Sequence, residues 1–544
     1  MKILTGLFIS LLALWIVTAV ILIQTIQNNG GNVIYSFDDA YIHMAIAKNF
    51  ASNGIWSISH DGFSSCSSSP LWTALIAAIY FVFSANTVTP MILNILSATG
   101  VLIFTFIVLR KEGIKQFTAM IVSLLMIILI PLPFLIFTGL EHVLHILISI
   151  MLIYIVSQQT DAKETTVKAL VVLAILSAIL PLLRYEGIVM IVISAIALII
   201  NRKWKPAVIM IIVSIIPVFL YGVYSVKQGW SFFPNSLSLK GDIPDVLSVS
   251  DFFGVILILF NKLFTKLNAL NLALMIFVFL VIISYPVIKN KFSGLKQRSI
   301  TMLFLFGANV ILYLLFSQTV WSYRYSSFLI AMGLFVFTYL LYSFRFTELK
   351  PPQVFLKKGI YLIVSIFLIY LAVSLGVKGA NTIMQTPVMT TNIYEQQYQM
   401  SMFLKRFYEN KVIALNDIGA TNYFADIKCV DLVGISDKEI SAVRRQHSFG
   451  MDVIRTVAAS RGINIAVLYD IWFSDGENSQ LPPDWIKVGE WQIQGEVLAG
   501  DNTISFYAVN EPEAKLLSEN LASFSGVLPA TVIQKGIYFK NRKL

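Results

Sequence analysis

The chain has 544 residues, 57% of them hydrophobic and only 13% charged, with a mean hydropathy of +0.76. This composition excludes an ordinary soluble protein and indicates a chain that crosses a membrane several times. The formal net charge of +10 does not predict a nucleic-acid partner, because Lys and Arg gather in the cytoplasmic loops of membrane proteins.

Recurring apolar stretches of about 20 residues predict about 11 transmembrane helices. The expected helices are residues 4–26, 88–109, 117–137, 139–157, 168–183, 187–201, 206–225, 267–288, 299–317, 326–343 and 358–377. The apolar segment 71–83 is too short to span a bilayer, so we expect it to lie at the membrane surface. No A-x-A cleavage site follows the first helix, which indicates a retained helix rather than a signal peptide.

The basic residues of the loops indicate the orientation of these helices. With segment 71–83 at the surface, most loop Lys and Arg fall on one side, for example in loops 110–115, 202–205 and 289–298. Cytoplasmic loops carry such an excess, so this side is predicted to be cytoplasmic. The loop 27–87 and the C-terminal region are then expected on the periplasmic or extracellular side of a bacterial plasma membrane.

The composition changes after residue 379, where polar residues become frequent and no further apolar span follows. Strand patterns at 411–415, 428–433 and 463–469, a helix pattern at 436–459 and a hairpin pattern at 492–498 and 503–509 indicate a small α/β domain. The sequence therefore predicts two domains, a transmembrane domain of residues 1–379 and an extracytoplasmic soluble domain of residues 380–544.

Two adjacent carboxylates, Asp38 and Asp39, begin a predicted helix in the loop 27–87. Ser36 and Asp39 have the spacing of a capping box, and Asp39 and His43 share one helix face. Acids next to a membrane are costly and indicate function, but acids in a first helical turn also favour the helix dipole. Both interpretations stay open from this loop alone, and the pair could also hold a divalent cation.

Four further outer loops carry ionisable or polar side chains. Their candidate site residues are Glu141, His142, His145, Arg184, Glu186, Asn235, Lys240 and Arg324. The cations suit an anionic headgroup or a phosphate, since Arg matches phosphate geometry and Lys acts as a point charge. The alternatives are helix capping by Thr138, a local ion pair between Arg184 and Glu186, and a simple turn at 233–235.

The order of these motifs resembles the GT-C superfamily of membrane glycosyltransferases. The motifs are the acid pair, SSSPLWT (67–73), TGLEH (138–142), RYEG (184–187), FPNS (233–236) followed by Lys240, and SYRY (322–325). Within the superfamily, the chain is most similar to the mycobacterial terminal β-arabinofuranosyltransferase and its bacterial relatives. The stretch ALNDIGATNYFADIKCVDLVGISD (414–437) is similar to the start of their C-terminal domain.

The resemblance implies a GT-C fold whose transmembrane domain is catalytic. Its donor is a polyprenyl-phosphate sugar in the outer leaflet, arabinofuranose being one candidate, and its acceptor is a hydroxyl of a glycan, lipid or protein. The catalytic base maps onto Asp38, with Asp39 adjacent, and transfer would invert the anomeric carbon. Tyr185 departs from the family pattern, which leaves the role of Glu186 open.

A transporter or lipid exporter is the alternative class of protein. Transporters place ionisable groups near the middle of the membrane and often contain inverted repeats. Here the ionisable residues lie at predicted helix ends and no repeat is visible, which favours the enzyme. The sequence indicates no certain cofactor and no metal cluster, and it leaves open whether Cys66 and Cys429 pair.

Overall fold

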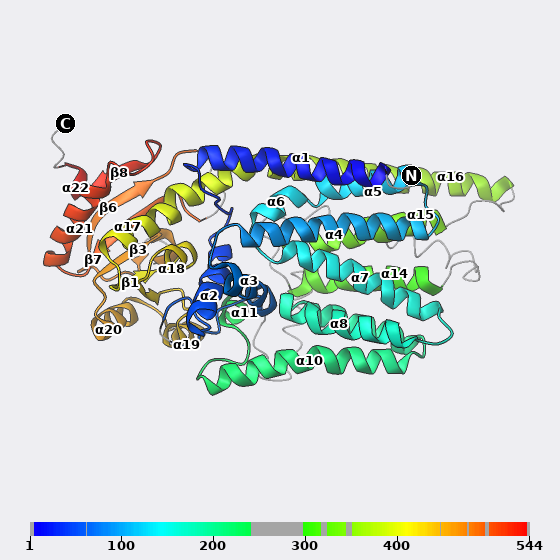
Figure 1. Ribbon diagram of the computed structural model, residues 1–544, viewed down its shortest axis with the longest axis horizontal. Helices are drawn as coiled ribbons and strands as arrows, with labels where there is room; N and C mark the ends of the chain where they lie inside the picture. The colour runs from blue at the N-terminus through cyan, green and yellow to red at the C-terminus, as the bar shows by residue number, and fades with distance from the viewer. Residues whose placement is uncertain are drawn as a thin grey trace.

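The computed structural model describes residues 5–60, 62–240, 297–316, 324–343, 351–446, 448–475, 478–495 and 500–540. Long helices lie side by side in a bundle, and a smaller domain with a sheet covers one end of that bundle (Figure 1). The predicted fold class, a polytopic helical membrane part followed by a C-terminal α/β domain, agrees with this arrangement. The predicted helix 267–288 lies outside the described residues.

The bundle is built from apolar helices. They are α1 (Thr5–Asn28), α4 (Thr89–Lys111), α5 (Gln116–Leu129), α6 (Leu132–Phe137), α7 (His142–Asp161), α8 (Val167–Leu183), α9 (Gly187–Ile200), α10 (Trp204–Lys227), α14 (Gln297–Phe316), α15 (Ser327–Ser343) and α16 (Pro351–Ile393). Among the described residues, four helices (α1, α4, α7 and α10) have both the length and the composition to cross a membrane. Others, such as α5, α8 and α9, are apolar but shorter.

The prediction of one helix at 117–137 is wrong. Helix α5 ends at Leu129, and the separate α6 begins at Leu132. Pro131 and Pro133 explain the break, because proline supplies no backbone N–H and its ring blocks the preceding turn. At this break α16 passes close to α5, and a Cβ at Gly379 would overlap the carbonyl oxygen of Ile128. Only glycine therefore fits there.

Two short helices, α2 (Asp39–Asn53) and α3 (Pro70–Phe83), lie between the bundle and the C-terminal domain (Figure 1). The segment 71–83, which we predict to lie at the membrane surface, forms α3. The predicted capping box is wrong, since α2 begins after Asp38 with no side-chain cap and the Ser36 hydroxyl has no partner. The backbone N–H of Ser36 instead donates to the Phe137 carbonyl at 2.9 Å, which ties this segment to α6.

The C-terminal domain contains a six-stranded sheet with strand order β2-β1-β3-β7-β6-β8. Its strands are β1 (Val412–Leu415), β2 (Lys428–Asp431), β3 (Ile465–Leu468), β6 (Ile486–Gln492), β7 (Thr503–Ala508) and β8 (Ile533–Gly536). Strands β1, β2 and β3 are parallel, whereas β7, β6 and β8 add antiparallel strands at one edge. A separate two-stranded sheet pairs β4 (Ser474–Asp475) with β5 (Asn478–Ser479).

The helices of this domain are short. They are α17 (Gln399–Phe407), α18 (Gly419–Phe424), α19 (Lys438–Arg445), α20 (Met451–Arg461), α21 (Glu511–Phe524) and α22 (Ile537–Lys540). The predicted single helix at 436–459 is wrong, because Gly450 adopts an extended conformation between α19 and α20. The first hairpin strand, predicted at 492–498, is wrong in position, because β6 ends at Gln492 and residues 493–495 form no strand.

Helix α16 joins the two parts of the molecule without a break. It runs from Pro351 to Ile393 beside α1, continues through the π-helical turn Tyr394–Tyr398 and leads directly into α17 (Figure 1). The predicted boundary at residue 379 therefore falls inside this helix. Phe403 of α17 packs in the domain core, with its ring 5.6 Å from that of Phe506 and 5.7 Å from that of Trp491.

Candidate active site

The start of α2 packs against the turn that precedes α7. The indole N–H of Trp72 in α3 donates to the carbonyl of Gly139 at 3.1 Å. Gly139 has a φ of +68°, and a Cβ there would lie 2.8 Å from the Tyr35 ring and 2.9 Å from Ala40. Glycine at 139 therefore permits both the left-handed turn and the close approach that brings Asp39 next to the end of the bundle.

Asp39 forms an ion pair with Arg324, which lies just before α15. The Arg324 Nη1 is 2.9 Å from the Asp39 Oδ2, and the side chain of Arg324 is only 7% exposed. The guanidinium also lies 4.5 Å from the centre of the Phe37 ring and 4.8 Å from that of Tyr325. A buried arginine needs such partners, because an unpaired charge is costly away from water.

A second arginine joins the same group from the turn between α8 and α9. Arg184 donates to Glu141 at 2.8 Å and to Glu186 at 2.7 Å, and its guanidinium lies 5.0 Å from the centre of the Tyr325 ring. Tyr325 therefore contacts both guanidiniums. The residues Asp39, Glu141, Arg184, Glu186, Arg324 and Tyr325 are called the arginine cluster below.

The electrostatics of the arginine cluster are set by burial and by ion pairing. Burial raises the pKa of Glu186, but the charge of Arg184 and its hydrogen bond outweigh this, so the pKa lies below its ordinary value. Glu186 is thus a paired carboxylate rather than a proton donor near neutral pH. Glu141 is almost fully buried, and its Oε2 accepts no hydrogen bond in the described structure.

The three predicted histidines are all buried but lie in different surroundings. The His142 ring packs edge-on against Tyr325 at 5.7 Å, which brings it to the arginine cluster. The His145 ring packs against Phe328 at 4.9 Å, one turn deeper in α7. The His43 Nδ1 lies 2.8 Å from the Thr73 hydroxyl of α3 and 3.3 Å from the Ser67 hydroxyl.

Asp38 makes different contacts from its neighbour Asp39. Its two carboxylate oxygens accept hydrogen bonds from the backbone N–H groups of Gly419 and Ala420, at 2.7 and 2.8 Å. A Cβ at Gly419 would overlap the Asp38 carbonyl oxygen, so the close approach requires glycine. These contacts between Asp38 and the start of α18 are called the junction below. Burial, followed by the charge of Asp417, raises the pKa of Asp38 well above its ordinary value.

Asn235 and Lys240 come from α11 (Asn235–Lys240). The Asn235 N–H donates to the Ser65 carbonyl at 2.9 Å, and its side-chain amide donates to the Gly434 carbonyl at 3.3 Å. The structure thus places Asn235 against the C-terminal domain rather than in the arginine cluster. The side chain of Lys240 lies outside the described part of the chain.

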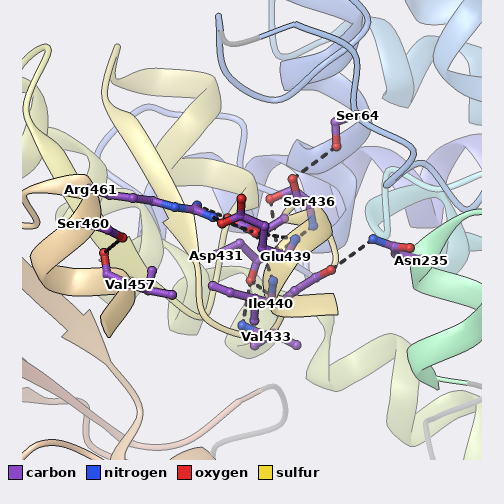
Figure 2. Close-up of polar contacts among 12 residues, drawn as sticks. Ser64, Asn235, Asp431, Val433, Ser436, Glu439, Ile440, Val457, Ser460 and Arg461 are labelled. Atoms are coloured by element: carbon purple, nitrogen blue, oxygen red, sulfur yellow. Dashed lines mark hydrogen bonds and ion pairs between the residues drawn. The ribbon is translucent and has the colours of Figure 1, made fainter. Parts of the chain in front are cut away.

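Figure 2 shows how the C-terminal domain meets the bundle near Asn235. The buried carboxylate of Asp431 accepts hydrogen bonds from the backbone N–H groups of Val433, Gly434 and Ser436 at 2.7–3.1 Å. This holds the loop after β2 so that its carbonyl groups face the bundle. Ser64 donates to the Ser436 carbonyl at 3.5 Å, next to the bond from Asn235 to Gly434.

A polar network that the sequence did not indicate lies next to the junction. The amide nitrogen of Gln397 donates to Asp417 at 2.8 Å and lies 2.7 Å from the Tyr469 hydroxyl. Gln397 lies in the π-helical turn that follows α16, and such turns are frequent at functional sites. Asp417 lies two residues after the end of β1, and an acid so close to a strand end is the sequence signal that could have indicated this network.

The described residues contain no group of three or more His, Cys, Asp or Glu side chains that could hold a metal ion. Cys66 and Cys429 are both free thiols in the structure, and burial raises the pKa of Cys66 to about 12. Neither thiol is therefore a candidate nucleophile, since the thiolate is the reactive form.

Comparison with known proteins gives one family match and one fold. Residues 391–507 match a family described as "Domain of unknown function (DUF8728)". No curated protein matches the sequence. Two crystal structures of ArnT from Cupriavidus metallidurans, one bound to undecaprenyl phosphate and one in the apo state, are similar to the chain. In each case the TM-score is 0.50, the identity is 11%, and the match covers 92% of this chain and 98% of ArnT. The chain thus has an ArnT-like fold, which confirms the predicted fold class.

Proposed function

We propose that the protein is a glycosyltransferase that moves a sugar from a polyprenyl-phosphate donor to a hydroxyl group of a glycan, lipid or protein. The observation that carries the proposal is the arginine cluster, which gathers the buried Arg324, the half-buried Arg184 and three acids at the end of the bundle. The ArnT-like fold supports it, since ArnT was crystallised with undecaprenyl phosphate. The motif resemblance further suggests arabinofuranose as the sugar.

The arginines are suited to bind the phosphate of the donor. Arg184 and Arg324 are held in place by Glu141, Glu186 and Asp39, so their guanidiniums are oriented before a ligand arrives. The phosphate gains negative charge as the bond to the sugar breaks. Fixed guanidinium groups stabilise that charge most in a site from which water is excluded.

The geometry supports Asp39 over Asp38 as the base. Both oxygens of Asp38 accept backbone N–H groups, whereas Asp39 belongs to the arginine cluster and its side chain is 31% exposed. In the proposed step, Asp39 accepts the proton of the acceptor hydroxyl group, and the oxygen of that hydroxyl group bonds to the anomeric carbon of the sugar. The bond from that carbon to the phosphate oxygen breaks, the electron pair leaves with the phosphate, and the configuration inverts.

The experiment that tests this function uses the purified full chain and radiolabelled polyprenyl-phosphate sugars, including polyprenyl-phosphate arabinofuranose. We expect label to pass to acceptors in a membrane extract. We expect Arg324→Gln to reduce donor use about ten- to a hundredfold, because a charge-assisted contact contributes about 1.5–3 kcal/mol. Lys515→Gln on the exposed face of α21 is the matched control. Wild-type kinetics in Arg324→Gln, or no transfer from any donor, would contradict the proposal.

The location of the site on the outer face is part of the proposal. Asn53 at the end of α2 and Lys163 after α7 are both exposed, and they lie at opposite ends of the bundle. In a chain with Cys66→Ser and Cys429→Ser, an impermeant thiol reagent added to intact cells should label Asn53→Cys and not Lys163→Cys. The reverse pattern would place the arginine cluster inside the cell.

A further inference from the structure

A pocket of about 380 Å³ lies between the loop after α10 and helix α19 of the C-terminal domain. It is called the loop pocket below. It is lined by Gly229, Trp230, Ser231, Asn235, Lys438, Glu439, Ala442 and Arg445. Its walls thus come from both parts of the molecule, an arrangement that is common for ligand sites between domains.

The charges of the loop pocket favour an anion. Glu439, the acid of the pocket lining, forms an ion pair with Arg461 of α20, which also pairs with Asp437. In the part of the chain that the structure describes, Lys438 and Arg445 have no carboxylate partner within ion-pair distance. Arg445 donates to the Ser231 hydroxyl at 2.8 Å and to the Asn235 side-chain oxygen at 3.2 Å, which orients its guanidinium across the pocket. The remaining guanidinium N–H groups are available to a ligand.

Trp230 adds an aromatic surface to this positive pocket. Its side chain is partly exposed, and it lies in the same wall as Ser231 and Asn235. An indole offers a flat apolar face with one N–H donor at its edge. This combination suits a sugar ring, which has an apolar face surrounded by hydroxyl groups.

The loop pocket is connected to the arginine cluster by a single loop. Residues 229–231 line the pocket, whereas Phe233 packs edge-on against Tyr185 at 6.0 Å. Tyr185 lies between Arg184 and Glu186 in the chain. Asn235, at the end of the loop, also donates its backbone N–H to Ser65 in the segment between α2 and α3. A ligand in the pocket would therefore contact the loop that also packs against the proposed donor site.

We propose that the loop pocket binds an anionic saccharide, the part of the acceptor that lies next to the hydroxyl group being modified. The inference rests on the proposed function and names the chemical class of its acceptor. A carboxylate or phosphate on the saccharide would bind Lys438 and Arg445, and the ring would stack on Trp230. The C-terminal domain would thus select the acceptor.

The binding test measures alkylation of a cysteine placed in the pocket. The full chain carries Ala442→Cys together with Cys66→Ser and Cys429→Ser, and the probes are trigalacturonate, neutral maltotriose and phosphatidylglycerol vesicles. We expect trigalacturonate to slow alkylation, maltotriose to have little effect, and the vesicles to have none. Equal protection by both saccharides, or protection by the vesicles alone, would overturn the proposal in favour of a neutral saccharide or a lipid headgroup.

Charge variants sharpen this test. Lys438→Gln and Arg445→Gln should each weaken protection by trigalacturonate about tenfold, since each removes a charge-assisted contact. Arg445→Gln also loses bonds to the bundle, so Lys438→Gln, which breaks no described hydrogen bond, is the cleaner variant. Lys515→Gln is the control and should behave as the wild type. Unchanged protection in Lys438→Gln and Arg445→Gln would overturn the proposal.

Donor binding by the wild type separates this proposal from the proposed function. A wild-type protein that binds labelled polyprenyl-phosphate sugar but shows no protection by trigalacturonate would refute the acceptor site alone. A protein that is protected by trigalacturonate but neither binds nor uses any donor would refute the proposed function alone.

Discussion

The arginine cluster contains Asp39 and the junction contains the adjacent Asp38, but the two carboxylates have different kinds of partner. Asp39 is paired with a side chain, Arg324, whereas Asp38 is held by backbone N–H groups of the C-terminal domain. The paired guanidinium of Arg324 keeps an Nε–H without a partner among the described residues, whereas a backbone amide has a single N–H and both amides are used by Asp38. The comparison supports our proposal that the two acids have separate tasks, Asp39 in the chemistry and Asp38 in joining the domains.

The largest effect should come from Asp39→Asn. This change keeps the size of the side chain but removes the basic oxygen, and loss of a general base typically costs about 10²–10⁴-fold in rate. Transfer from a saturating donor should fall by this factor while the protein stays folded. In Asp38→Asn, transfer should fall less. If Asp38→Asn is inactive and Asp39→Asn is active, the assignment of tasks is reversed.

Gly419→Ala should disrupt the junction, and its effect on the protein should be smaller than that of Asp39→Asn. The added Cβ would meet the Asp38 carbonyl oxygen, which is backbone and cannot turn aside. Overpacking of this kind typically costs about 1–3 kcal/mol. We expect faster hydrogen exchange at the start of α18.

Gly450→Ala is the control for the junction, because a Cβ there meets nothing within 4 Å. Exchange in α18 of the control should match that of the wild type. Wild-type exchange in Gly419→Ala as well would mean that the junction does not hold the domain in place.

The smallest effect should be a pH dependence of the junction. Burial and the charge of Asp417 raise the pKa of Asp38 in the folded protein, so the folded state keeps this proton to higher pH than the unfolded chain. The contribution of Asp38 to stability is then fully present below its unfolded pKa of about 3.9 and is lost as the pH rises through its folded pKa.

Thermal unfolding of the wild type and of Asp38→Asn over this pH range checks the dependence. The stability difference between the two proteins should shift against the wild type as the pH rises, because the asparagine does not titrate. A constant difference would show that Asp38 titrates alike in both states. The comparison with Asp39→Asn then shows whether the effect belongs to the junction alone.

Local patterns predicted local structure well. The first three strands of the C-terminal domain were confirmed, because each is a short apolar run between turn residues. The pairing of Arg184 with Glu186 was also accessible, since these residues are two apart in the chain. The alternative of a local ion pair was therefore correct, but it was incomplete, because Arg184 also forms an ion pair with Glu141.

Contacts between distant residues could not be predicted from such patterns. Asp39 and Arg324 are 285 residues apart, and Asp38 and Gly419 are 381 apart. Residue types indicated that acids and arginines belong to one site, but only the fold decides which acid meets which partner. The capping box failed for the same reason, because the position of Ser36 is set by its backbone bond to Phe137.

The unbroken helix from Pro351 to Phe407 has a mechanical consequence. Because this helix begins in the bundle and ends in the core of the C-terminal domain, a rotation of the bundle end about the helix axis would also rotate the C-terminal domain. Its one irregular turn, at Tyr394–Tyr398, carries Gln397, which holds Asp417 next to the junction. A change in the register of that turn would therefore move Gln397 relative to Asp417 and alter the contacts next to the junction.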